Sequence, residues 1–194
     1  AMPEIYIKGL NSFLSDLKKM PAQFKKAGAR TLNKLAAQGK TAASKKIREV
    51  YNIKAVDLRA KIKISKATQN KLIAVVTIKD RRGLPLIVFN ARQTKKGITY
   101  RVKKSAGNKF VKSAFIATME SGHKGVFERR GEKRKMEKGS YAGNRTLRQP
   151  IKELFRTDAV GMMNREGIRE IQRVVDEKLK EIFAHEIEWE LKKK

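Results

Sequence analysis

Apolar residues recur at helical spacing along the first fifty positions of the chain. Leu10, Phe13, Leu14, Leu17 and Met20 predict a short helix, with Asn11 or Ser12 as its cap and Pro21 at its end. A second stripe predicts a long helix over about residues 21–51; its members are Phe24, Gly28, Leu32, Leu35, Gly39, Ala43, Ile47 and Val50. Two of these are glycines, each costing about 1 kcal/mol of helix propensity relative to alanine. We therefore expect another element to cross closely at Gly28 and at Gly39.

The apolar period changes from helical spacing to two in the middle of the chain. Residues 61–66 and 72–78 predict a hairpin with a short polar turn at 68–70, after a short helix near Val56. Residues 84–89 predict a strand, which Pro85 restricts to an edge because it lacks an N–H. Further short alternating segments are 97–103, 109–111, 114–119, 126–128 and 149–155. Together they predict an antiparallel β-sandwich or curved sheet over 61–155.

A long amphipathic helix is predicted over residues 158–194. Its apolar stripe consists of Ile168, Ile171, Val175, Leu179, Ile182, Phe183, Ile187 and Leu191. The predicted fold class is therefore α+β, a single domain over 1–194 with two N-terminal helices, the central sheet and this C-terminal helix. Trp189 near its end is expected either in the core or at a contact with a neighbouring subunit.

Positive charge is concentrated in the centre of the sequence. The net charge is +28, from 47 basic and 19 acidic residues, and residues 61–156 hold 26 of the basic and 6 of the acidic ones. Residues 157–194 are nearly balanced, so the C-terminal helix is not the basic surface. A field of this sign attracts nucleic acid or acidic protein.

Two basic clusters are candidates for contact with a polyanion or a partner. The first comprises Lys95, Lys96, Arg101, Lys103 and Lys104; the second comprises Lys124, Arg129, Arg130, Lys133, Arg134, Lys135 and Lys138. On a strand, Arg101 and Lys103 would share one face while Tyr100 and Val102 share the other. The second cluster is expected in a mobile loop over about 124–148. The alternatives are a solvated charged loop, phosphate contacts without base specificity, or contact with an acidic neighbour.

The chain offers weak signals for an enzyme or a metal site. It has no cysteine, which excludes disulfides and thiolate metal ligands. His123 lies near Glu120 and Glu128, and His185 precedes Glu186, but no paired carboxylates or phosphate-binding loop accompany them. We expect no catalytic, cofactor-binding or metal-binding residue and no cofactor. The longest apolar run, residues 84–89, is too short to cross a membrane.

Four segments of the chain carry a recognisable combined pattern: residues 91–97 (ARQTKKG), 114–119 (AFIATM), 122–129 (GHKGVFER) and 150–155 (PIKELF). Taken in this order, and with weaker similarity near 32–34, 51–54 and 84–86, they resemble the prophage minor tail protein Z family. The similarity covers most of the chain, and most strongly residues 30–155. The family carries no catalytic motif that could be transferred.

The resemblance implies a non-enzymatic structural protein that completes the tail of a phage or prophage near the head–tail junction. Related tail-completion proteins pair long helices with a small β-sandwich and often form rings. The implied partners are other tail or neck proteins and further copies of the chain, and the implied location is the virion tail, after assembly in the host cytoplasm. The alternative function is a free basic protein that binds nucleic acid without base specificity. Residues 29–61 also resemble a helix-turn-helix, but the second helix of that pattern, Val56–Ala60, is too short to read base edges.

Overall fold

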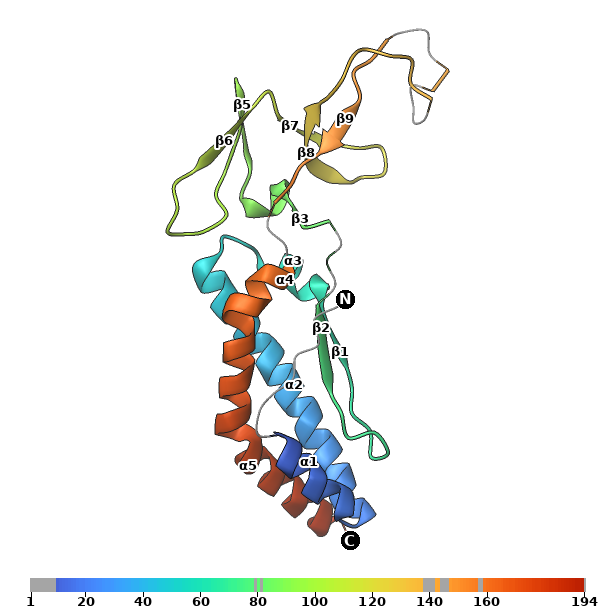
Figure 1. Cartoon of the computed structure of the whole chain (residues 1–194), viewed down its shortest axis with the longest axis vertical. Helices are drawn as coiled ribbons and strands as arrows, with labels where there is room; N and C mark the ends of the chain where they lie inside the picture. The colour runs from blue at the N-terminus through green and yellow to red at the C-terminus, as the bar shows by residue number, and fades with distance from the viewer. Residues whose placement is uncertain are drawn as a thin grey trace. The chain divides into compact units, whose positions relative to one another are not determined.

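The computed structural model describes residues 10–78, 80, 82–137, 142–143, 147–156 and 159–193 (Figure 1). The predicted α+β class is confirmed, with helices at the N-terminus, antiparallel sheets in the middle and a long C-terminal helix. The sequence predicts one domain, whereas the chain divides into two compact units. The helical unit comprises residues 1–49, 54–81 and 158–194, and the β unit comprises 50–53 and 82–157.

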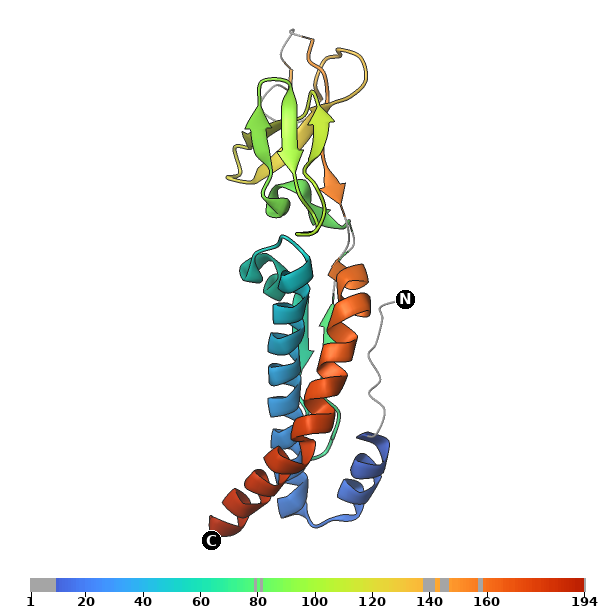
Figure 2. The same ribbon diagram turned by 90° about the vertical axis from the view of Figure 1, so that its left-hand side faces the viewer.

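The helical unit is built on two long antiparallel helices. Its helices are α1 (Leu10–Lys19), α2 (Ala22–Val50), α3 (Ala55–Lys61), α4 (Ala159–Met162) and α5 (Ile168–Lys192). Figures 1 and 2 show α2 and α5 side by side. The close crossings expected at the two glycines are present. A Cβ atom on Gly28 would overlap the Leu17 side chain of α1, and one on Gly39 would lie 3.2 Å from Cγ2 of Ile171 in α5.

A π-helical segment, η2 (Met163–Gly167), joins α4 to α5 without a break in the helix. Met162 and Met163 are buried at this junction. A Cβ atom on Gly167 would overlap the Met163 thioether. Glycine at this position therefore leaves the space that the Met163 side chain occupies. The apolar stripe predicted one regular helix here, because a single wide turn barely disturbs a helical period.

A hairpin of β1 (Ile62–Ser65) and β2 (Val75–Ile78) belongs to the helical unit, with Ile62 opposite Ile78. The predicted turn at 68–70 is too short, because residues 66–74 all lie outside the ladder. Asn33 of α2 holds this loop, since its side-chain amide donates to the Ala67 carbonyl (2.9 Å) and accepts from the Ala67 N–H (2.7 Å). Leu72 lies in this loop and belongs to the same buried cluster as Leu17 of α1 and Leu32 of α2.

The β unit consists of short antiparallel strands. They are β3 (Leu84–Pro85), β4 (Arg92–Thr94), β5 (Gly97–Tyr100), β6 (Lys109–Lys112), β7 (Phe115–Thr118), β8 (Lys124–Arg129), β9 (Ile151–Glu153) and β10 (Phe155–Arg156). They pair in the orders β4-β5-β6, β7-β8-β9 and β10-β3. The prediction of a strand over 84–89 is wrong beyond Pro85, because Leu86–Phe89 forms a 3₁₀ turn, η1, that buries Leu86 and Phe89.

A glutamine side chain connects the two three-stranded sheets. The Gln93 carboxamide accepts a hydrogen bond from the Ile116 N–H at 2.8 Å and lies 3.5 Å from the Ala114 carbonyl, with Nε2 toward that oxygen. Nε2 also donates to the Gly97 carbonyl at 3.0 Å. The amide thus takes the place of a backbone peptide between β4 and β7.

Candidate polyanion and partner interface

The structure separates the members of the first basic cluster. Lys95 and Lys96 form the turn between β4 and β5, whereas Arg101, Lys103 and Lys104 follow the other end of β5. All five are exposed. The four residues of β5 lie between Lys96 and Arg101, which places these two residues five steps or roughly 16 Å apart at about 3.3 Å per residue.

The residues after β5 leave the strand but keep their exposed positions. Tyr100 is buried, while Arg101 and Lys103 face solvent. The Arg101 N–H donates to the Phe89 carbonyl, and Lys103 forms an isolated bridge with Tyr51. The ammonium group of Lys103 also lies 6.0 Å from the centre of the Tyr51 ring. The backbone of this segment is therefore fixed, and its cationic groups project from an ordered surface.

A polar hollow of about 180 Å³ brings Arg101 together with an arginine that charge clustering did not select. It is lined by Asn52, Asn90, Arg92, Thr99, Tyr100, Arg101 and Asn108, which we call the arginine–asparagine hollow. Arg92 lies opposite Thr99 in the β4–β5 register. Asn90 adopts a left-handed conformation (φ 57°), which asparagine tolerates better than most residues. Two guanidinium groups beside amide donors suit an oxyanion such as a phosphate or carboxylate.

The second basic cluster divides between a strand and the segment after it. Lys124 and Arg129 lie in β8, so the expected loop begins after Arg129 and not at 124. Residues 124–129 form a central strand because they pair with both β7 and β9. Lys138 lies outside the described residues.

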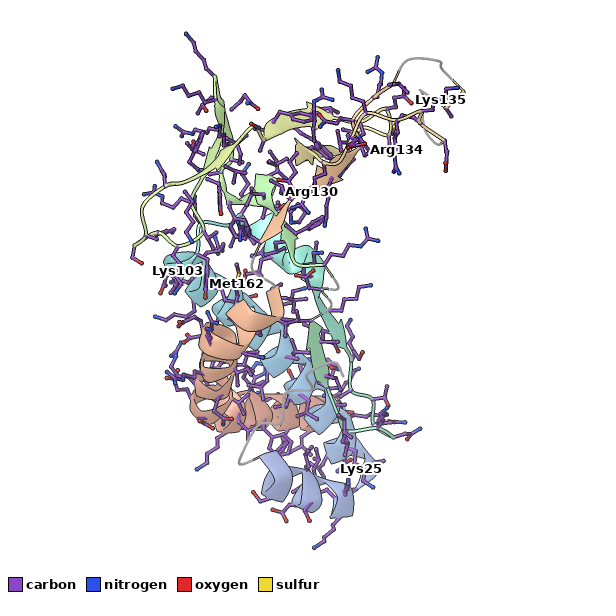
Figure 3. All side chains as sticks on the ribbon, turned by 45° about the horizontal axis from the view of Figure 1, so that its top comes forward. Lys25, Lys103, Arg130, Arg134, Lys135 and Met162 are labelled. Carbon is purple, nitrogen blue, oxygen red and sulfur yellow. The ribbon has the colours of Figure 1, made fainter. Side chains whose placement is uncertain are left out.

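Some of these charges have partners within the chain. The Arg130 guanidinium pairs with the Glu128 carboxylate, and the Arg129 guanidinium lies 5.3 Å from the centre of the Phe115 ring. Lys133, Arg134 and Lys135 are exposed, and Arg134 is held by backbone hydrogen bonds to Arg148 in both directions. Figure 3 shows Arg134 and Lys135 well apart from Lys103, so these members of the two clusters do not share one patch of the β unit.

The two histidines have ordinary polar partners. His123 Nε2 lies 2.9 Å from Glu153 Oε1, and His185 Nδ1 lies 3.9 Å from Glu186 Oε1. Within the parts of the chain that the structure describes, no group of three His, Cys, Asp or Glu side chains could hold a metal ion.

Glu186 is a buried charge of the helical unit that joins its two long helices. Its carboxylate meets Arg30 Nε and Lys34 Nζ of α2, each at 2.5 Å, and Arg30 also binds Glu190 at 2.6 Å. Burial raises the pKa of Glu186, but hydrogen bonds from Lys34 and Arg30 outweigh this effect and hold the pKa below its ordinary value. The Arg30 guanidinium also lies 4.3 Å from the Trp189 ring, so this network locks α5 onto α2.

Comparison with protein families decides what kind of protein this is. A model of the prophage minor tail protein Z family matches residues 7–193, which is nearly the whole chain. The chain belongs to this family. No curated protein and no solved structure matched the chain.

Membership gives this minor tail protein a structural role in a phage or prophage tail, and therefore a place in the virion beside other tail proteins. None of its described helices is long and apolar enough to cross a membrane. Sequence reasoning missed Arg92 and the joining role of Gln93, although both fall within the segment 91–97 that resembles the family. The pairing of Glu186 with Arg30 gave no signal in the sequence, since Arg30 precedes it by 156 positions.

Proposed function

We propose that this minor tail protein completes the tail near the head–tail junction and acts there through contacts between subunits. The family match over residues 7–193 carries this proposal, because it assigns nearly the whole chain to the tail. The chain combines long helices with a small unit of antiparallel strands. This supports the proposal, because it is the architecture that the resemblance to tail-completion proteins implies. The partners would be neighbouring tail or neck proteins, and assembly would take place in the host cytoplasm.

The location can be tested by labelling the protein in assembled phage. A short peptide tag placed after Lys194 would be decorated with gold-labelled antibody and viewed by electron microscopy. Label at the head-proximal end of the tail is expected. Label at the distal tip, or spread along the tube, would overturn the proposed location while leaving a tail role intact. An untagged phage stock gives the background.

We further propose that copies of the chain assemble with one another in the particle, as a ring or another homo-oligomer. Light scattering after nuclease treatment, at low and high salt, measures the mass directly. A discrete oligomer at both salt concentrations is expected from apolar contacts, which salt does not weaken. A monomer under both conditions would remove self-assembly of the isolated chain from the proposal.

The exposed basic residues are proposed to contact a polyanion, for which DNA passing through the tail is one source and an acidic neighbour is another. The arginine–asparagine hollow supports contact with a polyanion, because its guanidinium and amide donors match phosphate oxygens. It is also the observation that favours the alternative of a free nucleic-acid-binding protein.

Binding to random-sequence duplex DNA, measured against salt concentration, tests this contact. Reversing Arg92 and Arg101 to Glu should weaken binding and flatten its salt dependence, with about one unit of slope lost per phosphate contact. Glu188→Gln serves as a control, because that residue is exposed on α5. Unchanged affinity in the charge-reversed variant would exclude DNA contact at the hollow.

A further inference from the structure

Strands β4 to β9 of the β unit form an open series, with one free edge at each end among the described residues. Gln93 connects β4 to β7, which makes the order β6-β5-β4-β7-β8-β9. The inner edge of β7 is thereby occupied, since the Ile116 N–H bonds to the Gln93 side chain. In the part of the chain that the structure describes, strands β6 and β9 are the outer edges of the series.

The hydrogen-bond pattern of β9 identifies the groups that it presents at its free edge. Arg130 donates to the Pro150 carbonyl, and Leu154 donates to the Val126 carbonyl. Hydrogen-bonded and non-hydrogen-bonded pairs alternate along an antiparallel ladder. The pair midway between these two bonds, Glu128 and Lys152, is therefore hydrogen-bonded, so the N–H and C=O groups of Lys152 point toward β8. The N–H and C=O groups of Ile151 and Glu153 therefore point away from the sheet. The Ile151 side chain is also 41% exposed.

A groove of about 830 Å³ runs along this edge within the β unit. Residues from Ile151 to Arg156 form most of one wall, and Val111 of β6 contributes to the lining. Its apolar lining includes Leu86, Val111, Leu154 and Phe155, and its charged lining comprises Arg82, Glu128, Arg130, Lys152, Glu153 and Arg156. The groove thus combines an apolar surface, unpaired backbone groups and more cationic than anionic side chains.

These features fit an added β-strand better than a nucleic acid. A strand docked on an edge forms main-chain hydrogen bonds, and its alternate side chains enter pockets on one side. A period of two would direct apolar side chains toward Leu86 and Val111 and acidic side chains toward the arginines. A second copy of the strongly basic β unit is the poorer occupant, because like charges would face each other across the contact.

We infer that the groove beside β9 binds an extended segment of a partner protein in which acidic and apolar residues alternate. The segment pairs with the free N–H and C=O groups of Ile151 and Glu153. The proposal that the partner is a neighbouring tail protein rests on the proposed function, whereas the chemistry of the groove does not.

The test uses the full chain and synthetic peptides of about eight residues in which Glu alternates with Val. Binding is measured by fluorescence anisotropy, and amide hydrogen exchange locates it. Exchange at Ile151 and Glu153 should slow when the peptide binds, while the Lys152 amide, already directed at β8, should change little. The same peptide with one central residue replaced by proline should bind at least about tenfold more weakly, because proline lacks the N–H that donates to the ladder.

Charge reversal separates this groove from general attraction between charges. The double variant of Arg82→Glu and Arg156→Glu should weaken peptide binding by about tenfold or more. Lys63→Glu, at an exposed position of β1 in the helical unit, should leave it nearly unchanged. A thermal melt of each variant confirms folding.

Three results would overturn the inference. The first is unchanged exchange at Ile151 and Glu153 at millimolar peptide. The second is equal binding of the proline peptide, and the third is equal weakening by Lys63→Glu. Displacement by duplex DNA together with unchanged exchange would indicate a polyanion surface instead, and slowed exchange that depends on protein concentration without peptide would indicate a second copy. The labelling experiment on phage is independent of all these outcomes, so failure of the groove would leave the proposed location untouched.

Discussion

Neutralising Glu186 should destabilise the helical unit by an amount that the structure allows us to estimate. Glu186→Gln keeps the shape of the side chain but removes the charge that meets Arg30 and Lys34. A hydrogen bond to a charged group contributes about 1.5–3 kcal/mol. The Arg30 and Lys34 side chains are 33% and 50% exposed, so water screens part of each interaction. We therefore expect a loss of about 2 kcal/mol for the pair.

For a chain of this length, that loss corresponds to a fall in Tm of roughly 4–8 °C. Thermal unfolding is followed by circular dichroism and by the fluorescence of Trp189, the single tryptophan of the chain. The matched control is Glu188→Gln, because Glu188 lies two residues further along α5 and is exposed. Its free energy of unfolding should change by no more than about 0.5 kcal/mol. Equal shifts in both variants would refute the assigned role of the buried carboxylate.

The same comparison has a defined dependence on pH. The pKa of Glu186 is lowered in the folded protein, so its stabilising contribution is present above the unfolded-state pKa. This contribution is lost as the pH falls through the lowered, folded-state pKa. The difference in Tm between the wild type and Glu186→Gln should therefore be at its full size at neutral pH. It should shrink only when the pH falls below the ordinary pKa of a glutamate side chain. A difference that grows on acidification would contradict the assignment.

Three further predictions follow from packing and hydrogen bonding. Replacing Gln93 with Leu should accelerate hydrogen exchange at the Ile116 amide and cost about 0.5–1.5 kcal/mol, and unchanged exchange would show that the amide bridge is dispensable. Gly28→Ala should lower Tm despite a gain of about 1 kcal/mol in helix propensity, whereas a rise would disprove the close crossing with α1. Leu72→Ala should cost about 2–5 kcal/mol in urea unfolding, against little for the half-exposed neighbour Ile73→Ala, and equal costs would place Leu72 outside the core.

The sequence predicts the helices well because their signal is local. The stripe that contains Gly28 and Gly39 predicts both the extent of α2 and its close crossings. The loop over 66–74 was beyond local reasoning, because Leu72 looks like a strand residue and is instead drawn into the helical core. Residues 86–89 likewise look like a strand, but burial of Leu86 and Phe89 favours a tight turn after Pro85.

The candidate site is less predictable from the sequence than the fold. Density of charge identified exposed lysines and arginines, yet the first cluster separates to opposite ends of β5. The arginine–asparagine hollow depends on Arg92 and Arg101 meeting through the β4–β5 pairing, and on Asn52 arriving from the end of α2. The free edge of β9 depends on which peptide groups face β8. None of these properties follows from residue type alone.

The π-helical turn between α4 and α5 gives the chain a place where its length can change without rotating the helix. A π turn accommodates one residue more than an α turn, and each α-helical residue turns the chain by about 100°. Deleting one exposed residue from 163–167 would convert the π turn into an α turn, so α4 and α5 would keep nearly the same faces toward the core. Ala159 and Met162, both fully buried, would therefore stay buried. The same deletion in the regular part of α5 would instead rotate everything before it by about 100° and move both side chains off the core.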